Sequence, residues 1–227
     1  MKEFLIVAHR GASAYAKENT LEAYRLAIEQ HANAIEIDVR LTKDNKAICF
    51  HDETLRSFGI NMKPEEIMLD SIKDLIENDE IALLDDALDL IRDKTYVLFD
   101  VRDDKVAGYI LDSISKNELK RVYIISGRDY ILKEVRELDD KVKLGFWYFR
   151  YSNLINLIEE LNIELIKPNY RVCHKNDIER FHKLNRKVLT WVINNKEDMQ
   201  RFIEYGIDGI VTDDPKLLYN TLRQTLL

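Results

Sequence analysis

Residues 4–39 read FLIVAHRGASAYAKENTLEAYRLAIEQHANAIEIDV and contain two short apolar runs separated by an amphipathic stretch. The runs at 4–8 and 34–39 are rich in aliphatic and β-branched residues, which predicts buried strands. Between them, residues 19–22 (NTLE) resemble a capping box, and apolar residues follow at helical spacing. A strand, a helix and a second strand in this order favour parallel pairing, because parallel strands are usually joined by a helical crossover.

The same alternation of strand and helix patterns continues to the end of the chain. Six further apolar runs predict strands at 95–100, 122–126, 143–148, 163–167, 187–193 and 209–212. Eight such units in 227 residues favour an α/β fold of the (β/α)8 TIM-barrel type. A doubly wound open sheet is the alternative, but no glycine-rich dinucleotide-binding loop follows the first strand.

The interval between the second and third predicted strands is roughly twice as long as the others. Within it, LTKDNKAICF (41–50) predicts a β-hairpin whose central turn residues are 44–45. This register places four side chains on one face of the hairpin as two cross-strand pairs. The predicted pairs are Asp38 with His51 and Glu36 with Glu53.

The rest of this interval predicts a small insertion on one rim of the barrel, at about residues 53–82. It contains Pro64 and two short helical patterns, predicts no further strand, and is too small for a second core. We therefore expect one barrel domain over residues 1–227.

Composition and charge exclude several classes of protein. A net charge of −7 argues against a general nucleic-acid-binding protein, which would normally carry a basic face. The two cysteines, Cys49 and Cys173, show no pairing pattern and are expected to be reduced and buried. The chain has no secretory signal pattern and no run of about 20 apolar residues. We expect a cytoplasmic protein without stable membrane insertion.

Charged residues lie in or directly after several predicted strands. In chain order they are His9, Arg10, Glu36, Asp38, Asp100, Arg102 and Lys167, and Asp213 follows the last predicted strand. Strands covered by helices should be almost wholly apolar, so these exceptions require an explanation. Because barrel enzymes build their active sites at the carboxyl ends of the strands, we expect these side chains to meet there.

Three of these residues, Glu36, Asp38 and Asp100, form an all-oxygen set of carboxylates. Gathered in one cavity without a cation, they would repel one another and raise one another's pKa. A hard divalent cation relieves this repulsion, and oxygen ligands suit Ca²⁺ or Mg²⁺ better than zinc. The sequence therefore predicts a Ca²⁺ or Mg²⁺ site.

The remaining residues predict chemistry on a phosphate. His9 and His51 are candidates for general acid and base, since imidazole titrates near neutral pH. Arg10 offers a planar fork for an anionic pair of oxygens. Lys167, at the end of its strand, is a candidate for a phosphate or substrate contact. A cation, two histidines and an anionic substrate together indicate phosphodiester chemistry.

Four short motifs resemble, in order and spacing, the signature of glycerophosphodiester phosphodiesterases. They are His-Arg-Gly at 9–11, Glu-Asn-Thr at 18–20, Glu-x-Asp-Val at 36–39 and His-Asp at 51–52. Residues 190–215 also resemble the C-terminal segment of that family, so the resemblance covers essentially the whole chain.

The resemblance implies a TIM barrel that hydrolyses glycerophosphodiesters to sn-glycerol 3-phosphate and an alcohol. It implies a divalent metal ion at Glu36 and Asp38 and a phosphate contact at Arg10. It also implies that His9 and His51 are the acid–base pair and that Trp191 lines the pocket near the alcohol. The implied partner is a small molecule, a glycerophosphodiester or a lysophospholipid.

The third strand departs from the family pattern, which has Glu-x-Lys where this chain has Asp100-Val101-Arg102. Aspartate is one methylene shorter than glutamate, and arginine presents a fork instead of a point charge to the substrate. The choice of metal and of substrate therefore stays open at these two positions. A smaller departure is Lys17, where the family has proline.

Other functions remain as alternatives. The aromatic strand at 143–148 and the rim insertion are also consistent with a lysophospholipase D that cleaves lysophospholipids. A phosphatidylinositol-type phospholipase C fits the motifs less well, and the altered third carboxylate is consistent with a barrel that binds phosphodiesters without turnover.

The acid and base roles of the two histidines, the leaving alcohol and the oligomeric state are left open. Asp52 is expected either to cap the chain after His51 or to orient a histidine.

Overall fold

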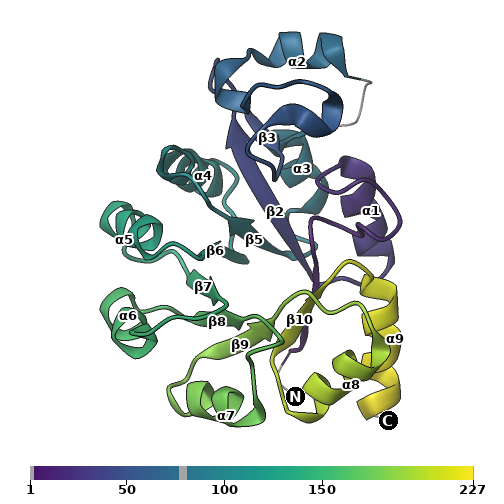
Figure 1. Ribbon diagram of the computed structural model, residues 1–227, viewed down its shortest axis with the longest axis vertical. Helices are drawn as coiled ribbons and strands as arrows, with labels where there is room; N and C mark the ends of the chain where they lie inside the picture. Colours follow the sequence, from purple (N-terminus) through teal and green to yellow (C-terminus); the bar gives the residue numbers. More distant parts are fainter. Residues whose placement is uncertain (1–2, 77–80, 227) are drawn as a thin grey trace.

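The computed structural model describes residues 3–76 and 81–226 and confirms the predicted TIM barrel (Figure 1). Its parallel strands are β1 (Leu5–Ala8), β2 (Ala34–Leu41), β5 (Tyr96–Asp100), β6 (Val122–Ser126), β7 (Leu144–Tyr148), β8 (Leu165–Pro168), β9 (Lys187–Thr190) and β10 (Gly209–Thr212). Each lies within a few residues of a predicted strand. The sheet closes on itself because β1 pairs with both β2 and β10.

Helices surround the strands and cover the outer face of the barrel (Figure 1). They are α1 (Leu21–Glu29), α3 (Leu84–Ile91), α4 (Asp104–Lys116), α5 (Asp129–Leu138), α6 (Leu154–Leu161), α7 (Lys175–Lys183), α8 (Lys196–Glu204) and α9 (Pro215–Leu226). Thr20 caps α1 because its hydroxyl accepts a hydrogen bond from the amide of Ala23, so the cap lies one residue later than the pattern at 19–22 implied. No helix in these two described ranges is long and apolar enough to cross a bilayer.

Successive strand residues point alternately into and out of the barrel, which produces two apolar layers. The outward layer packs under the helices, and the inward layer consists of Leu5, Val7, Ala34, Leu98, Tyr123, Ile125, Leu165, Leu189 and Val211. Continuing six of these seven inward rows by two residues toward the carboxyl end reaches His9, Glu36, Asp100, Lys167, Trp191 and Asp213, whereas the β6 row reaches Gly127. The alternation that fills the barrel therefore also places these side chains at its mouth.

The hairpin after β2 has a register that differs by one residue from the predicted one. β3 (Ala47–Cys49) pairs with β2 so that Val39 lies opposite Cys49. The turn is a three-residue loop: Asn45 adopts φ 56°, and the hydroxyl of Thr42 accepts a hydrogen bond from the amide of Lys46. The prediction of a two-residue turn was therefore wrong.

The two cross-strand pairs predicted from that turn are also absent from the described chain. Phe50, not His51, lies opposite Asp38, and its amide donates to the Asp38 carbonyl. Glu53 instead forms an ion pair with Lys63 on the rim. His51 lies beyond the end of β3, so its direction is set by the following turn and not by strand alternation.

The insertion on the rim contains the short helices η1 (Leu55–Phe58), η2 (Pro64–Glu66) and α2 (Leu69–Leu75). The expectation of no further strand was wrong, because β4 (Ala82–Leu83) pairs with β3 in antiparallel fashion. A small cluster of buried apolar side chains holds the insertion on the hairpin. Its members are Ile48, Phe50, Leu55, Ile67, Leu69 and Ile72.

Candidate active site

The chain turns sharply at the end of β1, where two consecutive residues have positive φ. Arg10 adopts φ 58° and Gly11 adopts φ 89°. A Cβ atom on Gly11 would approach the Cβ of Ala23 to 2.6 Å, so this position requires glycine for both its conformation and its packing. Because of this turn, the side chain of His9 points into the barrel mouth, and the backbone after it leaves the barrel toward α1. Left-handed conformations of larger residues such as Arg10 cost free energy and are concentrated at functional sites.

His9 is oriented by a carboxylate from the other end of the chain. Its Nδ1 lies 2.7 Å from Oδ1 of Asp213, which directly follows β10. Burial raises the pKa of Asp213, but hydrogen bonds with His9, Asn194 and Ser13 outweigh burial and keep it below its usual value. The contact occupies Nδ1 and leaves Nε2 directed at the carboxylates, 3.8 Å from Oε2 of Glu36.

His51 is held in the same way by its neighbour in sequence. Its Nδ1 lies 2.8 Å from Oδ1 of Asp52, so the structure assigns Asp52 the orienting role that the sequence left open. The His51 carbonyl accepts a hydrogen bond from Arg40 at 3.0 Å, which fixes the backbone after β3. Both histidines therefore have an aspartate on Nδ1 and Nε2 available for another partner.

Glu36 and Lys167 form a buried ion pair at the bottom of the site. Lys167 Nζ lies 2.5 Å from Glu36 Oε1, and each side chain is only 4% exposed. Burial raises the pKa of Glu36, but the charges of Lys167 and His9 outweigh burial and lower it to about 2. Within the described part of the chain, the other oxygen, Oε2, is buried without a hydrogen-bond partner.

Asp38 lies at the centre of a network from α1 and the β1 turn. Its Oδ2 accepts hydrogen bonds from Asn19 at 3.0 Å and contacts Arg10 Nε at 3.1 Å. Arg10 also donates to both oxygens of Glu18, each at 2.9 Å. Burial and the charge of Asp100 raise the pKa of Asp38, although Arg10 opposes them. Burial is the larger of the two causes, so the ionised form of Asp38 is disfavoured mainly by its separation from water.

Asp100, the last residue of β5, binds two side chains: Arg102, which follows the same strand, and Trp147 of β7. Arg102 donates to Oδ2 at 2.9 Å, and the indole of Trp147 donates to Oδ1 at 2.9 Å. Burial lowers the pKa of the Arg102 guanidinium, but Asp100 and Asp38 reverse this and raise it. Arg102 Nε also donates to Oδ2 at 3.2 Å, so the remaining acceptor capacity of Asp100 for a further ligand lies on Oδ1.

Nine side chains line a narrow pocket of about 50 Å³ at the mouth of the barrel. They are His9, Arg10, Glu36, Asp38, Asp100, Arg102, Trp147, Lys167 and Trp191. Eight of them were predicted as site residues, and Trp147 was left unassigned within an aromatic run. His51, the remaining predicted residue, lines a larger adjoining cavity of about 430 Å³, and Arg102 lines both. Trp191 packs edge-on against Trp147 and closes one side of the pocket.

The fit of the carboxylates to a metal ion follows from their donors and neighbours. Among the described residues, no group of three or more His, Cys, Asp or Glu side chains is arranged so that it could by itself hold a metal ion. Lys167, Arg10 and Arg102 form ion pairs with Glu36, Asp38 and Asp100, respectively. The unpartnered Glu36 Oε2 and the raised pKa of Asp38 nevertheless indicate a need for further positive charge. Oxygen donors of this kind fit a hard divalent cation.

Sequence reasoning did not assign Asp213 and Trp147 to the site. Asp213 was recognised only as a polar strand end, and its contact with His9 depends on closure of the barrel. Trp147 had one usable signal, because it alternates with Gly145 and so shares the inward row of β7.

Comparisons with known proteins show which family this chain resembles. The family model described as "Glycerophosphoryl diester phosphodiesterase family" matches residues 9–99 and 90–217. A glycerophosphodiester phosphodiesterase from Caldanaerobacter subterraneus subsp. tengcongensis is 31% identical, with 97% of this chain and 98% of that protein covered.

Two solved structures extend the comparison to three dimensions. A glycerophosphodiester phosphodiesterase from Thermotoga maritima has a TM-score of 0.83 at 28% identity, covering 97% of this chain and 99% of that one. An Oleispira antarctica phosphodiesterase, solved in complex with the product sn-glycerol-3-phosphate, has a TM-score of 0.87 at 20% identity, with 96% of each chain covered. At this lower identity the likeness establishes a shared fold.

Proposed function

The chain belongs to the glycerophosphoryl diester phosphodiesterase family, and from this premise we propose a metal-dependent hydrolysis of glycerophosphodiesters that uses two histidines. The products are sn-glycerol 3-phosphate and an alcohol, and the product bound to the Oleispira antarctica relative supports this assignment. One observation carries the proposal: His9 and His51 each have Nδ1 bound by an aspartate and lie beside a cluster of buried carboxylates.

Glu36, Asp38 and Asp100 would hold the divalent cation, either Ca²⁺ or Mg²⁺. Bound there, the cation supplies positive charge that polarises the phosphoryl oxygens. Lys167 keeps Glu36 ionised, and Asn19 orients Asp38, so both carboxylates are held ready as ligands. Arg102, which replaces the lysine of the family pattern, donates to Asp100 and lines both the pocket and the adjoining cavity.

The Nε2 atoms of the two histidines, which no aspartate among the described residues binds, transfer the protons. One takes a proton from the attacking hydroxyl or water while the new oxygen–phosphorus bond forms. The other gives a proton to the leaving oxygen as its bond to phosphorus breaks. We place the leaving alcohol beside His51, because the 430 Å³ cavity there has room for it and the pocket around His9 does not.

The cationic side chains bind the anionic centre. Arg10 contacts Asp38 through Nε and donates to Glu18 through Nη1, so its Nη2 is the nitrogen left for the phosphate, and the charge of Arg102 adds to its attraction. Trp191 and Trp147 form an apolar wall that excludes water from one side of the pocket. Every residue that lines the cavity beside His51 is polar or charged, so this cavity favours a polar leaving alcohol over the acyl chain of a lysophospholipid.

Purified protein with Ca²⁺, Mg²⁺ or Mn²⁺ should release sn-glycerol 3-phosphate from glycerophosphocholine, and EDTA should abolish the release. His9→Ala should lose this activity, whereas His182→Ala should retain it. His182 is a matched control because it is also bound by an aspartate, Asp208, but lies outside the pocket. Equal rates for wild type and His9→Ala with every metal and diester would overturn the proposal, as would preferential cleavage of lysophosphatidylcholine.

Metal binding is measured separately from activity. Titration calorimetry with Mn²⁺ should give a defined affinity for the wild type and a loss of about 10- to 100-fold or more in Glu36→Gln. Asp112→Asn, on the exposed face of α4, removes one carboxylate elsewhere and should bind Mn²⁺ like the wild type. The same affinity in all three proteins would remove Glu36 from the ligand set.

A further inference from the structure

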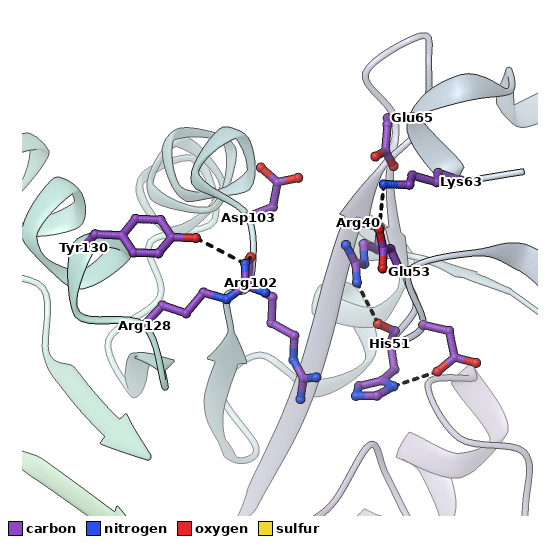
Figure 2. Close-up of a pocket in the computed structure, with 10 residues that line it drawn as sticks. Arg40, His51, Glu53, Lys63, Glu65, Arg102, Asp103, Arg128 and Tyr130 are labelled. Atoms are coloured by element: carbon purple, nitrogen blue, oxygen red, sulfur yellow. Dashed lines mark hydrogen bonds and ion pairs between the residues drawn. The ribbon is translucent and has the colours of Figure 1, made fainter. Parts of the chain in front are cut away.

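The cavity beside His51 lies between the hairpin side of the barrel and the segments that follow β5 and β6 (Figure 2). Arg40 of β2 and the insertion residue Lys63 lie on one wall, and Arg102 and Arg128 lie on the opposite wall (Figure 2). His51 occupies the end nearest to the narrow pocket, which also shares Arg102. A substrate bound at the carboxylates therefore has a continuous polar path into this cavity.

Most of the carboxylates in this cavity are already engaged. Glu53 forms an ion pair with Lys63 at 2.6 Å, and Asp52 binds His51 at 2.8 Å. Asp103 caps α4 and accepts a hydrogen bond from the amide of Lys105 at 3.0 Å. Glu65 lies beyond Lys63, at the end of the cavity away from His51 (Figure 2). The part of the cavity nearest to His51 is therefore not dominated by free negative charge.

Two guanidinium groups in this part of the cavity have only neutral acceptors. Arg40 donates to the His51 carbonyl at 3.0 Å. Arg128 donates to the Arg102 carbonyl and to the hydroxyl of Tyr130. Neither forms an ion pair with a carboxylate in residues 3–76 or 81–226, and both contribute to lowering the pKa of Glu53. Because each guanidinium has five N–H donors, each retains donors for a ligand.

We propose that this cavity recognises a second phosphate on the leaving alcohol, so that the preferred substrates are glycerophosphodiesters of a phosphorylated polyol or a similar anionic alcohol. Arg40 and Arg128 bind that phosphate from opposite walls. A terminal phosphate has three oxygen atoms and can accept hydrogen bonds from two guanidinium groups. A carboxylate has only two oxygen atoms, which a single guanidinium group binds as a pair. A volume of about 430 Å³ accommodates a phosphorylated short alcohol. This substrate class rests on the function proposed above.

Two synthetic diesters test this selectivity. In both, glycerol phosphate is esterified to 1,3-propanediol, and the far end of the propanediol carries either a free hydroxyl group or a phosphate. The wild type should have a higher kcat/KM for the phosphorylated diester, mainly through a lower KM. Arg128→Gln and Arg40→Gln should each reduce this preference by about tenfold, the effect of losing a charge-assisted hydrogen bond.

The ratio of the two kcat/KM values is the decisive measurement, because any general effect of a substitution on His51 or Arg102 cancels in it. Arg223→Gln is the matched control: it removes the same charge from α9, where the side chain packs over Tyr219, and should leave the ratio unchanged. Equal kcat/KM for the two diesters in the wild type, or an unchanged ratio in both cavity variants, contradicts the proposal.

A binding measurement separates failure of this inference from failure of the proposed function. In EDTA, titration calorimetry with each diester reports affinity without turnover. Tighter binding of the phosphorylated diester, lost in Arg128→Gln and kept in Arg223→Gln, supports the phosphate site even if neither diester is hydrolysed. Equal binding of the two diesters overturns it whether or not hydrolysis is observed.

Discussion

Asp213 holds Nδ1 of His9 at 2.7 Å, although 204 residues separate the two in sequence. The contact crosses the seam at which β10 pairs with β1, the last and first strands of the barrel. Asp213 also accepts a hydrogen bond from Asn194, which follows β9. Residues that follow β1, β9 and β10 therefore together fix the orientation of the His9 imidazole.

Replacing Asp213 by Asn should lower kcat for glycerophosphodiester hydrolysis by about 10- to 100-fold, because the imidazole loses the partner that fixes its tautomer and orientation. KM should change little. Asp208→Asn is the control, since Asp208 holds His182 outside the pocket in a similar pair. Similar losses of kcat in the two variants would show that Asp213 acts only through stability.

Asp213 also predicts a pH dependence of stability, because its pKa lies below the usual value of 3.8. A carboxyl group whose pKa is lowered by folding stabilises the native state above its unfolded pKa, and this contribution is lost as the pH falls through the folded pKa. The Tm difference between wild type and Asp213→Asn should therefore be largest above about pH 4 and shrink below it. Calorimetric scans across this range measure it, and a difference that grows on acidification contradicts the assignment.

Lys167→Met should destabilise the metal-free protein by about 3–5 kcal/mol, because it leaves the buried carboxylate of Glu36 unpaired. Chemical denaturation at neutral pH in EDTA measures this free energy of unfolding. Lys133→Met breaks a Lys–Glu pair whose side chains are 44% and 54% exposed and should cost no more than about 1 kcal/mol. A loss of similar size in both variants would mean that the Lys167–Glu36 pair contributes no more than an exposed one.

His51→Ala should reduce kcat/KM by about 10²–10⁴-fold for a diester with an alkyl leaving group, because that alcohol needs a proton as it departs. The loss should be much smaller for a p-nitrophenyl diester, whose leaving group is stable without protonation. His9→Ala should impair both substrates, since activation of the attacking group is needed in each case. Equal sensitivity of the two variants to the leaving group would refute the placement of the alcohol beside His51.

Much of the pocket could be predicted from the sequence, because two local rules determine it. Apolar runs in the sequence predicted every strand of the barrel. Side chains alternate along each strand, so Glu36, Asp100 and Lys167, two residues beyond the inward apolar layer, also point inward. Parallel strands end on one rim, so residues far apart in sequence were expected to meet there.

The rest depends on contacts that no local rule determines. The hairpin register follows from the side chain of Thr42 and the left-handed Asn45, and a two-residue turn fitted the same sequence pattern. The partner of His9 follows from barrel closure. The cavity lined by Arg40 and Arg128 depends on where the insertion folds relative to the segment after β6, and neither position carries a motif.

Closure of the barrel also has a consequence for the order of events during synthesis. His9 leaves the ribosome 204 residues before Asp213. A nascent chain that ends before β10 lacks both the strand that pairs with β1 to close the barrel and the carboxylate that orients His9. The Asp213–His9 contact therefore reports barrel closure, and a spectroscopic probe of the His9 ring can detect it.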